Sequence, residues 1–184
     1  MRRVETRRAE IRVLDMVLAG LLIALGMVLH GVFPGIVAGM KPDFALIMLF
    51  IAIMIIPDNR VKIAAGLATA VVTAMTTTFP GGQIANIVDK IVTTAVVMGL
   101  TAVLPRQIQV IGVGAVGTLV SGLVFLGTAA LVAGLPASFL YLMVSVVLPA
   151  MAINTVSLLV LYPLASKLYS MQQASQEPSV QRAK

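Results

Sequence analysis

Six apolar stretches with few charged residues constrain this 184-residue sequence more than any other feature. Hydrophobic residues make up 59% of the chain and charged residues only 11%, whereas soluble domains are about 25% charged. The chain therefore lacks the ionisable side chains needed to cover a surface that faces water. We expect an integral membrane protein built from helices, because a helix satisfies its backbone polar groups within lipid.

Proline, glycine and charged residues separate the apolar stretches and predict where each helix ends. A helix that crosses the bilayer needs about 20 residues; the second stretch is shorter, so we expect it to borrow loop residues or to enter the membrane only partly. The sequence predicts an all-α, polytopic membrane protein, a compact bundle of six transmembrane helices. The predicted helices cover residues 13–33, 44–56, 61–75, 83–104, 108–133 and 137–169, the last with a bend near Pro149.

These helices divide the chain into a basic N-terminal segment (residues 1–12), a transmembrane domain (13–169) and a polar tail (170–184). Six crossings place both termini on one side. Eleven of the 13 Lys and Arg residues fall on that side, and only Lys41 and Lys90 on the other. Because cytoplasmic loops are enriched in basic residues, both termini are expected to be cytoplasmic. The net charge of +6 thus reflects topology, and no nucleic-acid partner is expected.

The fourth predicted helix carries a polar face with two adjacent charged residues, Asp89 and Lys90. A helix turns by about 100° per residue, so its polar residues fall within an arc of about 140°. An ionisable group at membrane depth costs roughly 2.5–3.5 kcal/mol and usually marks function. The residues that share this face are Gln83, Asn86, Asp89, Lys90, Thr93 and Thr94.

A second charged pair, Lys41 and Asp43, lies in the first loop on the same predicted outer side. The two pairs together supply two cations and two anions, as a zwitterionic ligand requires. Phe79 and Tyr141 lie near the same level and suit a ligand with a large side chain. The alternative is structural, with the charges locking the loop onto the bundle.

Other notable residues have ordinary explanations as well. Gly20 and Ala24 on the first helix are small residues at helical spacing, which permits close helix packing or contact with a helix of a partner protein. Asn154 on the sixth helix is a candidate ligand contact, with an interhelical hydrogen bond as the alternative. Small residues in the fifth helix, Gly114, Gly117, Thr118, Ser121 and Gly122, are interpreted as packing residues.

Several kinds of chemistry are excluded or disfavoured. The sequence has no Cys and one His, so no metal site or other cofactor is expected. It contains no G-x-x-x-x-G-K-[ST] phosphate-binding loop and therefore is not itself an ATPase. Ser121 lies in only a faint match to an intramembrane serine-protease motif. A binding or transport protein is expected rather than an enzyme.

Three short segments resemble the bacterial tryptophan transporter family, TrpP, in the same order along residues 13–169. That family in turn resembles the substrate-binding S components of energy-coupling factor (ECF) transporters, which are six-helix membrane proteins. The segments are Gly39-Met40-Lys41-Pro42-Asp43, Thr76-Thr77-Thr78-Phe79-Pro80-Gly81-Gly82 with Asn86-Ile87-Val88-Asp89-Lys90, and Leu148-Pro149-Ala150 with Ile153-Asn154-Thr155.

The resemblance implies uptake of tryptophan through the bacterial plasma membrane by a substrate-binding subunit. Its partners would be a transmembrane coupling subunit, contacted through Gly20 and Ala24, and two cytosolic ATPase subunits. It further implies that the substrate pocket contains Lys41, Asp43, Asn86, Asp89 and Lys90. In the resulting hypothesis Lys90 or Lys41 pairs with the substrate carboxylate, Asp89 or Asp43 with the ammonium, and Asn86 or Gln83 accepts the indole N–H beside Phe79.

Two other functions stay open at this stage. The first is an autonomous secondary permease for amino acids in which Asp89 carries the coupling proton. The second is a membrane sensor or assembly protein that transports nothing and uses its polar face only to hold helices together.

Overall fold

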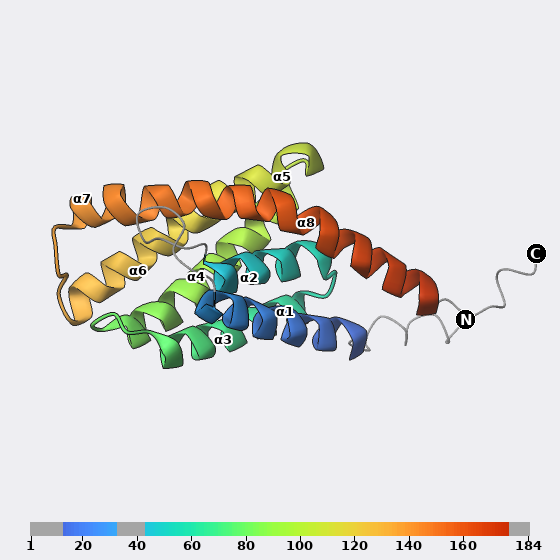
Figure 1. The fold of residues 1–184 in the computed structure, drawn as a ribbon, viewed down its shortest axis with the longest axis horizontal. Coiled ribbons are helices and arrows are strands. Elements are labelled where there is room, and N and C mark those ends of the chain that lie inside the picture. The colour runs from blue at the N-terminus through green and yellow to red at the C-terminus, as the bar shows by residue number, and fades with distance from the viewer. Residues whose placement is uncertain (1–12, 33–42, 177–184) are drawn as a thin grey trace, which may run out of the picture.

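The computed structural model describes residues 13–32 and 43–176, and these ranges are helical and contain no strand. Six helices lie alongside one another in a bundle (Figure 1), and two of them include a short π-helical segment. They are α1 (Val13–Val32), α2 (Phe44–Ile55), α3 (Asn59–Thr76), α4 (Gly82–Val103), α5–η2–α6 (Arg106–Gly112, Val113–Gly117, Thr118–Val132) and α7–η3–α8 (Phe139–Leu142, Met143–Val147, Leu148–Gln176).

The predicted helix positions agree with the structure to within a few residues, with one exception. Helix α8 continues to Gln176 rather than ending at Tyr169, because residues 170–176 contain neither Gly nor Pro and include good helix formers. Four helices are long and apolar enough to cross a membrane. Helices α2, with 12 residues, and α3, which begins with charged residues, are not among them, so six crossings stay a prediction.

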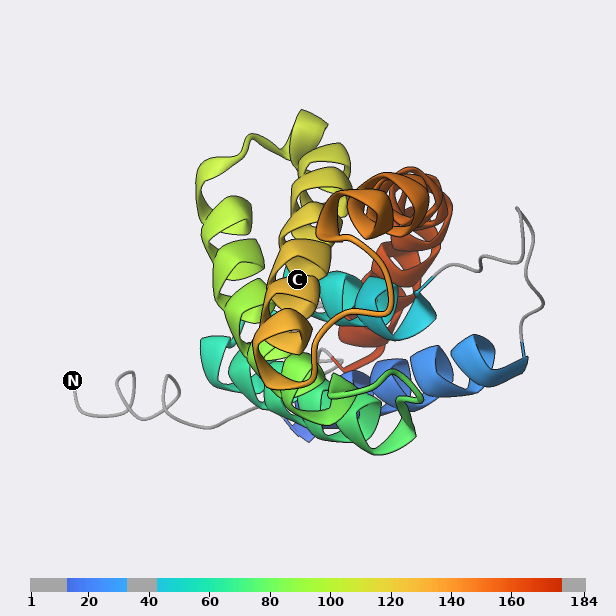
Figure 2. The same ribbon diagram turned by 90° about the vertical axis from the view of Figure 1, so that its left-hand side faces the viewer.

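Helix α2 forms the centre of the bundle (Figure 2). All residues from Phe44 to Ile53 are buried against α1, α3, α4 and α8. A helix that is apolar on every side is stable in such a position. Its N-terminus is capped by Asp43, whose Oδ1 accepts a hydrogen bond from the Leu46 amide at 3.1 Å. The helix therefore begins at Phe44 without borrowing loop residues, and longer helices surround it.

The bundle has an apolar exterior and a partly polar interior, as a protein surrounded by lipid requires. Helix α4 shows this most clearly, because its polar face points inward as predicted. The exposed residues of α4 include Ile84, Ile87, Val88, Ile91 and Val92, whereas the buried ones include Asn86, Asp89, Lys90, Thr93 and Thr94.

Helix α6 and the π-helical segment η2 pack closely on the last helix. A Cβ atom added to Gly114 would lie 2.9 Å from Cα of Thr155, and one added to Gly122 would overlap the side chain of Val147. The predicted packing role of these glycines is confirmed. The π-helical segment η3 ends at Val147, two residues before Pro149, and the bend expected there stays a prediction. Proline has no amide hydrogen to donate to the preceding turn, and the helix nonetheless continues as α8.

Asp15 links the first helix to the last. It is fully buried, and its Oδ1 accepts a hydrogen bond from the hydroxyl of Tyr169 at 2.9 Å. From its place next to the basic segment 1–12, Asp15 is also expected to pair with an N-terminal arginine, and those arginines lie outside the described residues. Helix α1 thus begins, and α8 ends, at the same end of the bundle (Figure 1).

Candidate functional site

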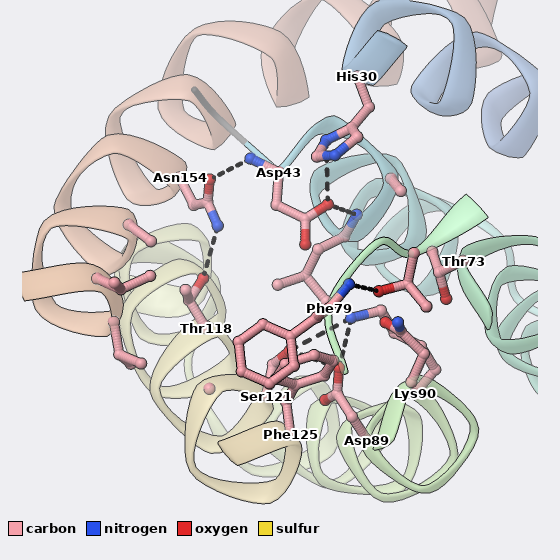
Figure 3. A pocket seen from close by; sticks show the side chains of 18 of the residues that line it. His30, Asp43, Thr73, Phe79, Asp89, Lys90, Thr118, Ser121, Phe125 and Asn154 are labelled. Atoms are coloured by element: carbon pink, nitrogen blue, oxygen red, sulfur yellow. Dashed lines mark hydrogen bonds and ion pairs between the residues drawn. The ribbon is translucent and has the colours of Figure 1, made fainter. Parts of the chain in front are cut away.

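A cavity of about 680 Å³ opens at the other end of the bundle, between the end of α1, the start of α2, the turn between α3 and α4, and helices α4, α6 and α8. Its size is typical of pockets that bind small molecules. Polar side chains from several helices converge on it (Figure 3).

The ionic centre of the cavity is the pair formed by Asp89 and Lys90. Lys90 Nζ donates to Asp89 Oδ2 at 2.5 Å, and the two residues are only 1% and 2% exposed. The Ser121 hydroxyl of α6 donates to the same Oδ2 at 3.0 Å, and Thr93 donates to Asp89 Oδ1 at 2.8 Å. Each charge has its counter-ion one residue away, so the helix tolerates both inside the membrane.

A second polar cluster surrounds Asp43 at the start of α2. The Asp43 amide donates to Oδ1 of Asn154 on α8 at 2.8 Å, and Nδ2 of Asn154 lies 3.5 Å from the Thr118 hydroxyl on α6. His30 at the end of α1 has its Nδ1 3.8 Å from Asp43 Oδ1. The Asp43 side chain is 35% exposed, so one carboxylate of the cavity is partly open while Asp89 is enclosed.

The remaining wall of the cavity is aromatic and aliphatic. Phe79, in the turn between α3 and α4, packs edge-to-face against Phe125 of α6 with the ring centroids 5.3 Å apart. The Phe79 amide donates to the Thr77 hydroxyl at 3.3 Å, which fixes the turn. The aliphatic residues that continue this wall are Leu126, Leu142, Val146 and Val147.

Charged groups of both signs and an aromatic wall therefore face one cavity. Such a site can bind a zwitterion through ion pairs and enclose an apolar ring, because a desolvated ammonium and a desolvated carboxylate each need a charged partner. Among the residues that the structure describes, no group of three acidic or histidine side chains is placed to hold a metal ion.

The structure places the nine predicted site residues in three groups. Six of them line the cavity: Asp43, Phe79, Asn86, Asp89, Lys90 and Asn154. Gln83 and Tyr141 do not: Gln83 is exposed in the first turn of α4, and Tyr141 is 63% exposed. The ninth, Lys41, lies outside the described residues and stays a prediction.

Both alternatives raised for Asn154 are present in part. Asn154 makes the interhelical contacts described above and also lines the cavity. Asn86 lines the cavity as well, and its Nδ2 donates to the carbonyl of Gly82 at 2.9 Å within α4. Its side-chain oxygen is left to accept a hydrogen bond from a ligand.

Sequence reasoning missed several lining residues on other helices. Thr118, Ser121 and Phe125 share one face of α6, yet they lie in a stretch that was interpreted as packing. Their spacing of three and four residues was the available signal, since it predicts one helix face. His30 and Thr73 also line the cavity, and neither belongs to a pattern that points to a ligand.

The two residues predicted to contact a partner lie elsewhere on the surface. Gly20 and Ala24 are exposed on α1, and a Cβ atom added to Gly20 would meet no atom within 4 Å. They are not used for packing within the described part of the chain, and this surface is open to another molecule.

The sequence matches a family model described as "Tryptophan transporter TrpP" over residues 12–170. Three curated relatives, each named "Probable tryptophan transport protein", are 40–45% identical. The protein of Bacillus subtilis (strain 168) is 40% identical over 158 residues, and that of Clostridium perfringens (strain 13 / Type A) is 42% identical over 169 residues. Each alignment covers 84% of this chain and 91% of the relative.

The third relative, from Clostridium acetobutylicum, is 45% identical over 147 residues, which cover 77% of this chain and 85% of the relative. No solved structure matches the chain.

Proposed function

Because this chain belongs to the tryptophan transporter TrpP family, a family of membrane transport proteins and not of enzymes, we propose that it binds tryptophan in the described cavity and carries it into the cell. One observation carries the proposal: the buried ion pair of Asp89 and Lys90 faces the same cavity as the aromatic pair of Phe79 and Phe125. Tryptophan combines a zwitterion with an aromatic ring and matches both features.

In the proposed arrangement the protein is the substrate-binding subunit of an ECF-type importer in the bacterial plasma membrane. It crosses the membrane six times with both termini in the cytoplasm, as the distribution of its basic residues favours. The sequence has no phosphate-binding loop, so ATP hydrolysis would come from two cytosolic partners. A transmembrane coupling subunit would contact α1 at Gly20 and Ala24.

Ligand binding can be measured without a label. The chain contains no Trp, so added tryptophan supplies the only indole emission in a purified sample. We expect its emission to shift to the blue and to saturate as it enters the cavity. Asp89→Asn should weaken this binding, whereas Asp15→Asn, at the opposite end of the bundle, should not. Absence of a saturable shift in the wild-type protein would refute the proposed substrate.

The energy source is tested separately, by uptake of labelled tryptophan into cells. Loss of uptake when the ATPase partners are deleted, with uptake resistant to an uncoupler, is expected for the ECF mode. The reverse pattern would identify a secondary permease. If the protein shows neither uptake nor binding of tryptophan, the structural or sensory role remains.

A further inference from the structure

The two carboxylates in the cavity differ in how far their oxygens are already occupied. Asp89 accepts three hydrogen bonds from side chains, one at Oδ1 and two at Oδ2. Both oxygens of Asp89 are therefore already bonded within the protein. If Asp89 bound the substrate ammonium, it would have to give up bonds to Lys90, Thr93 or Ser121.

Asp43 has the opposite character. Its Oδ1 caps α2 and lies near His30, but Oδ2 has no hydrogen-bond partner among residues 13–32 and 43–176. The backbone of Asp43 is fixed by Asn154, and the side chain lines the cavity with 35% of its surface exposed. A carboxylate oxygen that is positioned, unoccupied and open to the cavity can accept a bond from an ammonium group without breaking another.

The cation of the site also has a free donor. Lys90 Nζ carries three N–H groups; one donates to Asp89 and a second approaches Ser121 at 3.4 Å. The third can donate to a ligand carboxylate, whereas the single hydrogen of the neighbouring Ser121 hydroxyl is already donated to Asp89. Ser121 is one helical turn from Phe125 on α6, so this anion site adjoins the aromatic wall of the cavity.

We propose that the substrate binds with a fixed polarity: its ammonium on Asp43, its carboxylate on Lys90, and its indole against Phe79 and Phe125. Asp89 is then a positioning residue, which holds Lys90 in place and does not touch the substrate. This inference rests on the proposed function, because it assigns the groups of tryptophan to residues of the same cavity.

The test uses two analogues that each lack one charged group. Indolepropionate has no ammonium and tryptamine has no carboxylate, and both carry the indole whose emission reports binding. A site that bonds a polar group of its ligand can reject the analogue that lacks it by up to about 10⁴-fold. For each variant we compare the ratio of the dissociation constants of analogue and tryptophan. A general loss of structure weakens the binding of both ligands and leaves the ratio of their dissociation constants unchanged.

We expect Asp43→Asn to weaken the binding of tryptophan by roughly 10- to 100-fold and to leave the binding of indolepropionate nearly unchanged. The ratio of the two dissociation constants therefore collapses. Asp89→Asn should weaken binding but keep this ratio at the wild-type value. Lys90→Gln should collapse the tryptamine ratio, and if it folds poorly, the double variant Asp89→Asn with Lys90→Gln removes both charges and should give the same result.

Asp58→Asn is the matched control for Asp43→Asn. Asp58 caps α3 through the Arg60 amide at 2.8 Å and does not line the cavity, and Asn caps a helix as well as Asp does. It should change neither ratio. The assigned polarity would be overturned if the indolepropionate ratio collapsed in Asp89→Asn instead of Asp43→Asn, or if it collapsed in neither variant. In both cases the binding of tryptophan itself would stand. Failure of the wild-type protein to bind tryptophan would overturn the proposed function and the polarity with it.

Discussion

At the scale of single residues, adjacent charges of opposite sign make a polar cavity compatible with lipid. Asp89 and Lys90 follow one another on α4, and both turn inward. The pair is neutral as a whole, so each ion has a partner before any ligand arrives. Thr93 and Ser121 add hydrogen bonds to the carboxylate, and together they hold the ammonium at the cavity wall.

Removing one ion of this pair should therefore cost more than removing both. Breaking a buried ion pair typically destabilises by about 3–5 kcal/mol, whereas replacing both ions with apolar residues is often nearly neutral. We expect Lys90→Met to lower the thermal unfolding midpoint in detergent well below that of Asp89→Leu with Lys90→Met. Equal midpoints for the single and double variants would show that leaving the Asp89 carboxylate unpaired has no extra cost.

The aromatic wall makes a second prediction at this scale. Phe125→Ala should weaken tryptophan binding by about 1–2 kcal/mol, roughly 5- to 30-fold, because it removes both ring contact and apolar surface. Phe139→Ala is the control, since Phe139 is exposed and does not line the cavity. Titration of indole emission measures both. Similar losses in the two variants would argue against a ring site at Phe125.

At the scale of elements, α1 presents two different faces to its surroundings. Gly26 lies against α2, where an added Cβ atom would come within 2.8 Å of the Phe44 carbonyl oxygen and 3.0 Å of the Met48 Cβ. Gly20 lies on the outer face, where an added Cβ atom would have no neighbour within 4 Å among the described residues of the other helices. The first glycine allows two helices to approach closely, and the second leaves an open surface.

The two glycines should therefore respond differently to the same change. Gly26→Leu forces α1 from α2 and should destabilise the protein by roughly 1–3 kcal/mol, as measured by thermal unfolding. Gly20→Leu should leave the unfolding midpoint and tryptophan binding unchanged but reduce uptake in cells that contain the partner subunits. If uptake is unaffected by Gly20→Leu, the proposed contact with a coupling subunit is not at this glycine.

At the scale of the whole molecule, the described helices form a bundle with lipid-compatible side chains outside and the ion pair inside. The cavity lies at one end, and the hydrogen bond between Asp15 and Tyr169 ties α1 to α8 at the other. In the proposed orientation, with both termini in the cytoplasm, the cavity opens to the outside of the cell, and the joined ends of α1 and α8 face the cytoplasm.

The absence of Cys from the sequence makes this topology directly testable. Pro136 lies in the loop between α6 and α7, and Gln107 lies in the first turns of α5; both are exposed. An impermeant thiol reagent should label Pro136→Cys on intact cells and Gln107→Cys only after the membrane is opened. Labelling of both or neither on intact cells would contradict six crossings with cytoplasmic termini.

Much of this architecture could be predicted because its causes are local. Apolar runs and the prolines, glycines and charges between them predicted where helices begin and end, since each helix satisfies its own backbone hydrogen bonds. The period of 3.6 residues predicted the inward face of α4. Asp43, Asp89 and Lys90, which line the cavity, could be singled out as candidates because charged residues are rare in this composition.

Only the tertiary structure decided how these helices are arranged and rotated around one another. In the structure α2 lies at the centre, and Ser121 and Phe125 of α6 line the same cavity as the ion pair of α4. Gln83 and Tyr141 do not line the cavity. The physical reason is that hydropathy and periodicity describe one helix at a time, whereas the lining of a cavity depends on side-chain packing between helices that are distant in sequence.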